Sequence, residues 1–288
     1  MIGMERGDSI VHVIAIAIAA AFGAGLSTWA INHYVARPSL AVDDQSCNTL
    51  GILVHGTIVG TRADVPISDV FQIQDASGGT TLQYPNYTIA EDIEDRVRYY
   101  KDDPSIKAIL LDVDSGGGAQ VGSEDIVVAL RQLQKPTVAV IHDMGASGGY
   151  LVASAADLVF ANDDSLVGSI GVTSSFVSQY EKDKKEGYRY EALSSAPYKD
   201  MLNPDKPLTD AERAIIMRDL AINHEHFVAI VAANRGLPAE KVSALADGSA
   251  MLGEQALDNG LVDKLGSTWD AIEYLREKIG EEPVICWQ

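Results

Sequence analysis

The sequence contains few of the residues that build metal and thiol sites. Only two cysteines, Cys47 and Cys286, occur among its 288 residues, and two distant cysteines do not make a zinc site. The segment His224-Glu225-His226 lacks the His-Glu-x-x-His spacing of zinc peptidases. We therefore expect no metal and no cofactor. The two cysteines could pair in an oxidising compartment, and the sequence leaves that open.

Positive charge is also scarce. The chain carries 22 Lys and Arg against 41 Asp and Glu, a formal net charge of −19 at pH 7. Such a balance disfavours binding to the phosphate backbone of nucleic acids and strong attraction to anionic lipid. We expect no nucleic-acid partner.

The chain has one long apolar run, at its N-terminus. Residues 10–31 carry no charged side chain, and a helix of that length spans about 33 Å, enough for a bilayer. A cleaved signal peptide is the alternative, but the preceding residues hold only Arg6 against two acids, and the run is longer than an ordinary signal-peptide core. We favour an uncleaved anchor. The expected division is a tail at 1–9, a transmembrane anchor at 10–31, a linker at 32–48 and a soluble domain at 49–288.

Apolar runs alternate with helical patterns along the soluble domain. This alternation predicts an α/β fold with a mainly parallel sheet, and no internal repeat is visible. Thr209 and Glu212 have the spacing of a capping box that opens the last helix. The expected strands lie at 50–60, 106–113, 137–142, 158–161 and 188–193, and the expected helices at 88–101, 123–134, 147–157 and 208–235.

Two glycine-rich segments follow two of these strands. Ser147 lies within the segment 145–150, Gly-Ala-Ser-Gly-Gly-Tyr, where a strand is expected to turn sharply into a helix. The glycines leave its oxygen uncrowded, and Gly148 would offer its N–H at the start of the helix to a developing oxyanion. The segment 114–118, Asp-Ser-Gly-Gly-Gly, would make a second loop of N–H donors. A phosphate loop is less well supported because no Gly-x-x-x-x-Gly-Lys is present. Two segments of N–H donors, one of which carries a serine, suit acyl transfer.

The sequence gives poor support to a histidine as the base that activates Ser147. His142 lies in the strand before the serine, and His224 shares a helix face with apolar residues, so both are expected to pack. A lysine can serve as base when burial lowers its pKa. Lys199 lies beyond the expected strand 188–193, but spacing alone does not single it out among the lysines.

Several motifs in one order resemble the signal peptide peptidase A family of Ser-Lys membrane proteases. The likeness runs from about Leu50 to Gly266 and is carried by residues 51–60, 114–118, 145–150, 168–172, 198–201, 253–257 and 260–263. It implies a Clp protease/crotonase-like fold for residues 49–288, in the family's single-copy form. It also implies Ser147 as nucleophile, Lys199 as general base and the N–H groups of Gly117 and Gly148 as oxyanion hole. Gly116 departs from the family, which usually has proline there.

The resemblance further implies how such a protein works. It would degrade remnant signal peptides and other small apolar membrane-associated peptides, with its catalytic domain on the extracytoplasmic side. Single-copy members would form a homo-oligomeric ring, an octamer being one candidate size, in which Lys199 of one chain meets Ser147 of its neighbour. The alternatives are an α/β-hydrolase-type esterase, which Gly-x-Ser-x-Gly at 145–149 also fits, and a non-catalytic membrane scaffold. A phage head-maturation protease is a variant of the first function.

Overall fold

The computed structural model describes residues 47–74, 80–84 and 86–287. The expected tail, the transmembrane anchor at 10–31 and almost all of the linker lie outside these ranges. Within them, no helix is both long enough and apolar enough to cross a bilayer.

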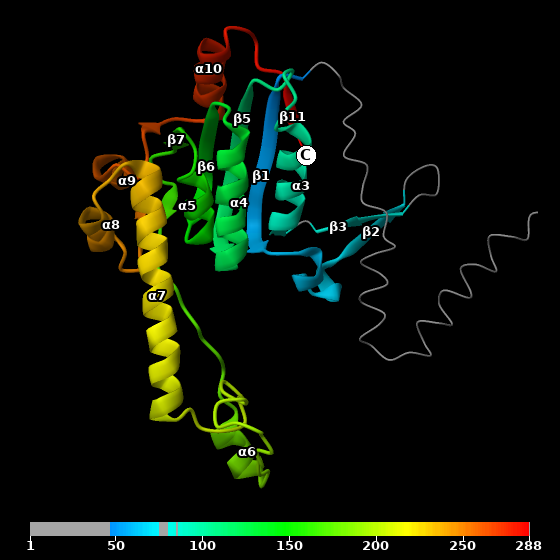
Figure 1. Ribbon diagram of the computed structural model, residues 1–288, viewed down its shortest axis with the longest axis vertical. Coiled ribbons are helices and arrows are strands. Elements are labelled where there is room, and N and C mark those ends of the chain that lie inside the picture. The colour runs from blue at the N-terminus through cyan, green and yellow to red at the C-terminus, as the bar shows by residue number, and fades with distance from the viewer. Residues whose placement is uncertain (1–46, 75–79, 85, 288) are drawn as a thin grey trace, which may run out of the picture.

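The described domain is built on a mainly parallel sheet, as the alternating pattern predicts. Its path runs β10-β7-β6-β5-β1-β11 (Figure 1). The four central strands fall on the predicted apolar runs, because strands buried on both faces are continuously hydrophobic. The path consists of β1 (Thr49–Val59), β5 (Ala108–Gly118), β6 (Thr137–Ala146), β7 (Leu158–Ala161), β10 (Lys264–Leu265) and β11 (Ile285–Trp287). The arrangement fits a Clp protease-like fold.

Further short strands extend this sheet beside the central ones. Strand β4 (Tyr87–Ile89) pairs parallel with the end of β1, and β8 (Leu166–Gly168) pairs parallel with the end of β6. Strand β9 (Ala250–Leu252) is antiparallel to β8. A separate antiparallel pair, β2 (Phe71–Gln74) and β3 (Thr80–Gln83), follows the short helices η1 (Arg62–Asp64) and η2 (Ile67–Asp69).

Helices cover both faces of the sheet. Residues alternate along β5: Ile109 and Leu111 enter the larger core with α3 (Ala90–Tyr100), α4 (Gln120–Leu133) and α5 (Gly148–Ala153). Ala108 and Leu110 enter a smaller core on the opposite face, against α10 (Thr268–Ile279). This two-sided burial fixes the register of the strands and therefore the position of the loops at their ends.

An extended arm leaves this layered domain. Helix α7 (Asp210–Arg235) projects away from the sheet, and α6 (Tyr180–Glu186) lies beside its far end (Figure 1). The C-terminal part of α7 is anchored in the larger core through Phe227 and Val231. Near its root lie α8 (Ala239–Leu245) and α9 (Gly253–Asn259). We call residues 173–223 the arm.

The strand expected at 188–193 is not formed, and that prediction is wrong. These residues have no regular secondary structure, and their side chains are exposed. They lie in the arm beyond Gly187, which ends α6 in a left-handed conformation (φ 86°). Alternating tyrosines and charged residues imitate a strand pattern, but among the described residues no strand pairs with this segment.

The two cysteines form a disulfide. Cys47 precedes β1 and Cys286 lies in β11, and their Cα atoms are 5.8 Å apart. Because β11 pairs parallel with the start of β1, the bond joins the two ends of the described domain at one side of the sheet. It resolves the pairing that the sequence leaves open.

Candidate active site

Ser147 lies at the junction of β6 and α5 in a backbone conformation that side chains rarely adopt. Its φ is 51° and its ψ −125°. The surrounding chain holds this geometry: the Ser147 N–H donates to the Gly168 carbonyl (2.8 Å), and its carbonyl accepts the Leu151 N–H (2.9 Å). Backbone strain at a non-glycine residue persists only where the surroundings impose it, and it clusters at functional sites. The sharp strand-to-helix turn that was predicted is present.

The second glycine segment comes directly against this turn. A Cβ placed on Gly117 would lie 2.5 Å from the Gly148 nitrogen and 2.9 Å from the Ser147 Cβ. Gly117 has a φ of 92°, which glycine adopts without steric cost. The structure therefore brings Ser147, Gly148 and Gly117 together, as the predicted site requires.

Segment 114–118 is not the free loop that the sequence suggests. Strand β5 continues through Gly118, and after a register shift Gly117 pairs with Thr57 of β1. Such a bulge re-aims the backbone while the strand continues. The glycines are thus held by the sheet, which fixes their N–H groups more firmly than a loop would.

The two N–H groups of the candidate oxyanion hole differ in their surroundings. Gly148 is the first residue of α5, so its N–H has no partner within the helix. The Gly117 N–H already donates to the Ser115 Oγ (3.1 Å), whose own hydroxyl donates to the Gly56 carbonyl (2.6 Å). Gly117 can therefore stabilise an oxyanion only if it shares or releases the bond to Ser115. Sequence reasoning missed this role of Ser115, because no local pattern reveals it.

Three of the histidines are engaged with partners other than Ser147. His55 and His142 each place Nε2 against a different oxygen of Asp112, at 2.6 and 2.9 Å. His224 is half-buried and meets the Ala246 carbonyl at 2.9 Å. None of these three contacts involves Ser147. Within the ranges that the structure describes, no cluster of His, Cys, Asp or Glu is arranged to hold a metal.

Lys199 lies in the arm, in an exposed turn between α6 and α7. This end of the arm projects away from the sheet whose β6–α5 junction carries Ser147 (Figure 1). One protomer therefore does not bring its lysine and serine together. Successive backbone hydrogen bonds hold the turn together. In one of them, the Lys199 N–H donates to the Ala196 carbonyl (3.3 Å).

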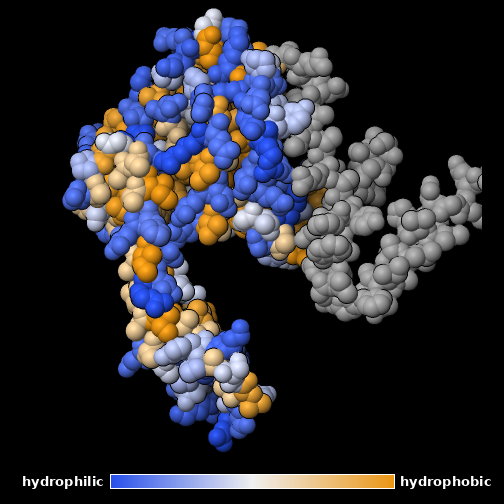
Figure 2. Space-filling view, in the orientation of Figure 1, coloured by the Kyte–Doolittle hydropathy of each residue, from blue (hydrophilic) through white to orange (hydrophobic). Residues whose placement is uncertain are grey.

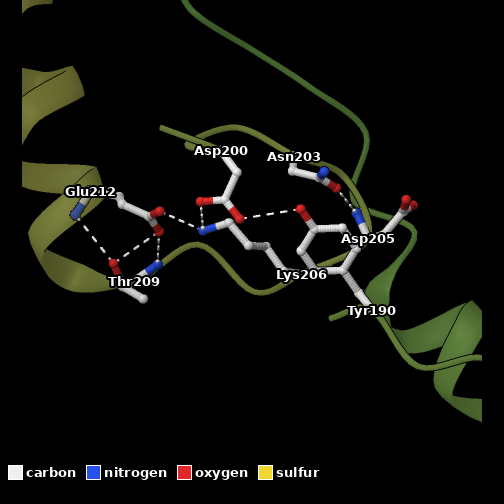
Figure 3. A network of polar contacts seen from close by, with 7 residues as sticks. All are labelled: Tyr190, Asp200, Asn203, Asp205, Lys206, Thr209 and Glu212. Atoms are coloured by element: carbon white, nitrogen blue, oxygen red, sulfur yellow. Dashed lines mark hydrogen bonds and ion pairs between the residues drawn. The ribbon is translucent and has the colours of Figure 1, made fainter. Parts of the chain in front are cut away.

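A polar network surrounds the residues that follow Lys199 (Figure 3). Lys206 is paired with Glu212 and lies 3.8 Å from Asp200. The hydrogen bond from Lys206, followed by those from the Thr209 backbone and hydroxyl, lowers the pKa of Glu212 to about 2. The same bond raises the pKa of Lys206. Lys206 is therefore held as a cation and is unsuited to act as a base.

Only one part of this network is visible in the sequence. The predicted capping box is present, since the Glu212 N–H donates to the Thr209 hydroxyl (3.3 Å) and the Thr209 N–H donates to the Glu212 side chain (2.9 Å). The ion pairs of Lys206 follow no local spacing rule, and sequence reasoning did not find them.

Comparison with known proteins shows which family the chain resembles. The model of "Peptidase family S49" matches residues 129–281, more than half of the chain. A candidate protease of Synechocystis is 36% identical over 178 residues, covering 61% of this chain and 64% of that protein. A candidate signal peptide peptidase SppA of Enterococcus faecium is 31% identical over 186 residues, covering 64% and 54%. The capsid assembly protease C of phage lambda is 30% identical over 259 residues, covering 88% and 55%.

The matched region includes Ser147, Lys199 and Gly148, whereas Gly117 precedes it. The chain spans less than two thirds of the length of each of these curated relatives. The resemblance to signal peptide peptidase A is confirmed, and the chain belongs to peptidase family S49.

Proposed function

We propose that this protein is a membrane-anchored serine endopeptidase that uses Ser147 as nucleophile and Lys199 as general base. One observation carries the proposal: Ser147 occupies a strained turn at the start of α5, in contact with the backbone of both Gly117 and Gly148. A neutral lysine amine would take the proton from the serine hydroxyl as its oxygen attacks the peptide carbonyl. The N–H of Gly148, and that of Gly117 once it turns from Ser115, would stabilise the oxyanion.

The position of the arm supports a dyad formed between neighbouring subunits. Lys199 is exposed at the end that projects from its own sheet, so a partner's arm is the natural source of the base. The arm also exposes large apolar side chains, among them Val177, Leu193 and Met217, at 83%, 98% and 57%, and Figure 2 shows apolar and polar residues interleaved along it. We take these exposed side chains as part of a subunit contact, although polar residues separate them along the arm. A homo-oligomeric ring, with an octamer as one candidate size, would cover them and lower the lysine pKa by desolvation.

Two features support a location outside the cytoplasm. The uncharged residues 10–31 have the length and composition of a membrane anchor. The disulfide between Cys47 and Cys286 suits an oxidising compartment, since disulfides seldom persist in the cytosol. We propose a single-pass protein with its catalytic domain on the extracytoplasmic side.

Remnant signal peptides and other small apolar membrane-associated peptides are the proposed substrates. The name of the Enterococcus faecium relative supports this class, and a site framed by glycines suits an extended peptide backbone. We expect small or aliphatic side chains next to the cut. A strict requirement for a charged residue there, in cleavage profiling, would contradict this.

The phage match favours a second candidate, a peptidase that acts in capsid assembly. It would use the same serine and lysine, and membrane attachment distinguishes the two. The full chain should sediment with membranes and resist extraction by high salt and alkali if residues 10–31 are an anchor. Recovery in the soluble fraction would favour the capsid function.

Complementation between inactive chains tests the dyad. Ser147→Ala and Lys199→Ala proteins are each expected to lose peptide hydrolysis by several orders of magnitude. When they are mixed and exchange subunits, some interfaces carry both intact groups, and activity should return. A mixture that stays inactive after exchange has been demonstrated, by fluorescence transfer between labelled chains, would rule out a dyad shared between subunits.

A further inference from the structure

We propose that Lys206 is a positioning residue for Lys199, because it ties Asp200, the residue that follows Lys199, to Glu212 at the start of α7. This inference rests on the proposed role of Lys199 as general base. A base must hold its proton-accepting atom within hydrogen-bond reach of the nucleophile. An exposed lysine on a projecting turn needs support from its own chain before it can meet that demand.

The support begins in the domain core. The C-terminal part of α7 is fixed there by Phe227 and Val231, and the rest of the helix extends away from the core (Figure 1). Among the α7 residues that precede Phe227, the buried one is Glu212, with a relative exposure of 2%. A buried carboxylate needs a charged or hydrogen-bonded partner to offset its desolvation. Lys206 and the capping residue Thr209 are those partners.

Lys206 then connects α7 with the turn that carries Lys199. Its ammonium group contacts Glu212 on one side and lies 3.8 Å from Asp200 on the other. All three side chains are sheltered: Lys206 and Asp200 are 17% and 15% exposed, and Glu212 is almost fully buried. Asp200 also accepts a hydrogen bond from the Tyr190 hydroxyl (3.2 Å). Figure 3 shows Lys206 between the two carboxylates. Sheltered pairs are screened by salt less than surface pairs.

Apolar contacts do not enclose the turn. A pocket of about 380 Å³, open to solvent, lies between residues 174–178, residues 202–208 and α7, and is lined by Phe176, Leu202 and Met217 among others. Leu202 has a φ of 68°, a conformation that is unfavourable for a bulky side chain. A turn that holds a bulky residue at a positive φ needs a restraint to keep that geometry. The ion pairs of Lys206 supply that restraint.

The test compares variants that break the link with variants that keep it. Lys206→Met removes both ion pairs, and Lys206→Arg keeps a cation that can reach both carboxylates. Asp200→Asn leaves the Lys206–Glu212 pair intact and weakens its connection to the turn, while the amide oxygen can still accept the hydrogen bond from Tyr190. We expect kcat to fall by on the order of 100-fold in Lys206→Met, with KM unchanged. Asp200→Asn should lower kcat in the same direction, and Lys206→Arg should restore most of it.

A matched control separates positioning from general stability. Arg235→Met breaks a sheltered ion pair with Asp263 at the other end of α7. It should lower the unfolding midpoint at least as much as Lys206→Met does while leaving kcat unchanged. Amide hydrogen exchange at residues 196–203 should accelerate in Lys206→Met and remain unchanged in Arg235→Met.

Two results would overturn the inference. The first is a wild-type kcat in folded Lys206→Met or, if that variant does not fold, in Asp200→Asn. The second is a loss of kcat in the Arg235→Met control equal to that in Lys206→Met. Lys199→Ala distinguishes this failure from that of the proposed function. If Lys199→Ala keeps full activity, the base assignment fails; if it is inactive while the Lys206 and Asp200 variants turn over normally, only the positioning role fails.

Discussion

Gly117 and Gly148 come into backbone contact beside Ser147, so closely that a Cβ on Gly117 would lie 2.5 Å from the Gly148 nitrogen. The two residues belong to different elements, the end of β5 and the start of α5. A side chain at position 117 cannot be accommodated by rotation, because the obstacle is backbone.

Gly117→Ala should therefore lower kcat, whereas an alanine at another strained glycine, remote from the site, should lower only stability. The methyl group would push the Gly148 N–H away from the carbonyl it is proposed to polarise, and losing one such donor costs about 100- to 1000-fold in kcat. Gly236→Ala is the control, since Gly236 has a φ of 61° and open space around it. It should lower stability by about 1–2 kcal/mol with kcat unchanged. Equal kcat values for the two variants would argue against the oxyanion hole.

Replacement of Ser147 should reveal the strain stored at the turn. Ser147→Gly relieves a φ of 51° that alanine retains. We expect Ser147→Gly to be more stable than Ser147→Ala by about 1 kcal/mol, although both are inactive. Urea unfolding measures the difference. Equal midpoints would show that the strain released is no larger than the extra backbone entropy that glycine loses on folding.

Loss of the disulfide should destabilise the domain strongly. The bond links two residues with a sequence separation of 239. Replacing both Cys47 and Cys286 by alanine should lower the free energy of unfolding by about 2–5 kcal/mol. Guanidinium unfolding with and without reductant tests this. Reductant should lower the midpoint of the wild-type protein and leave that of the double variant unchanged. If reductant does not change the unfolding midpoint of the wild-type protein, the disulfide does not contribute to stability.

The stability that Glu212 contributes should disappear in acid. Its pKa in the folded protein is about 2, below the ordinary 4.5, chiefly because of the hydrogen bond from Lys206. A carboxyl with a lowered pKa stabilises the fold above its unfolded pKa, and this contribution is lost as pH falls toward the folded value. The difference in unfolding free energy between wild type and Glu212→Gln should thus be constant above about pH 5 and shrink toward pH 2. In a Lys206→Met background that pH dependence should be much weaker; an unaltered dependence would contradict the assigned cause.

The sequence predicts the centre of the fold better than its periphery. The strands near Ile109, Val140 and Phe160 are recognised because burial on both faces leaves uninterrupted apolar runs. The turn at Ser147 is recognised from the glycines around it. The arm is misread at 188–193, because whether tyrosines at alternate positions form a strand depends on a neighbour that the sequence does not specify.

The features that the sequence does not predict are contacts between residues far apart in the chain. The capping box of Thr209 and Glu212 has a fixed spacing and is predicted, whereas the Lys206 pairs and the Ser115 contact with Gly56 depend on how separate segments come together. Pairing of Cys47 with Cys286 likewise follows from the parallel register of β1 and β11.

That disulfide also determines how the domain bears mechanical force. Tension applied through the chain before Cys47 divides at that residue, passing along the backbone into β1 and through the sulfur bridge into β11. These two strands run parallel and are hydrogen-bonded to each other, so the pull shears both together. Unzipping the edge of the sheet would then require breaking a covalent bond, and the first element to yield under tension should lie elsewhere in the domain.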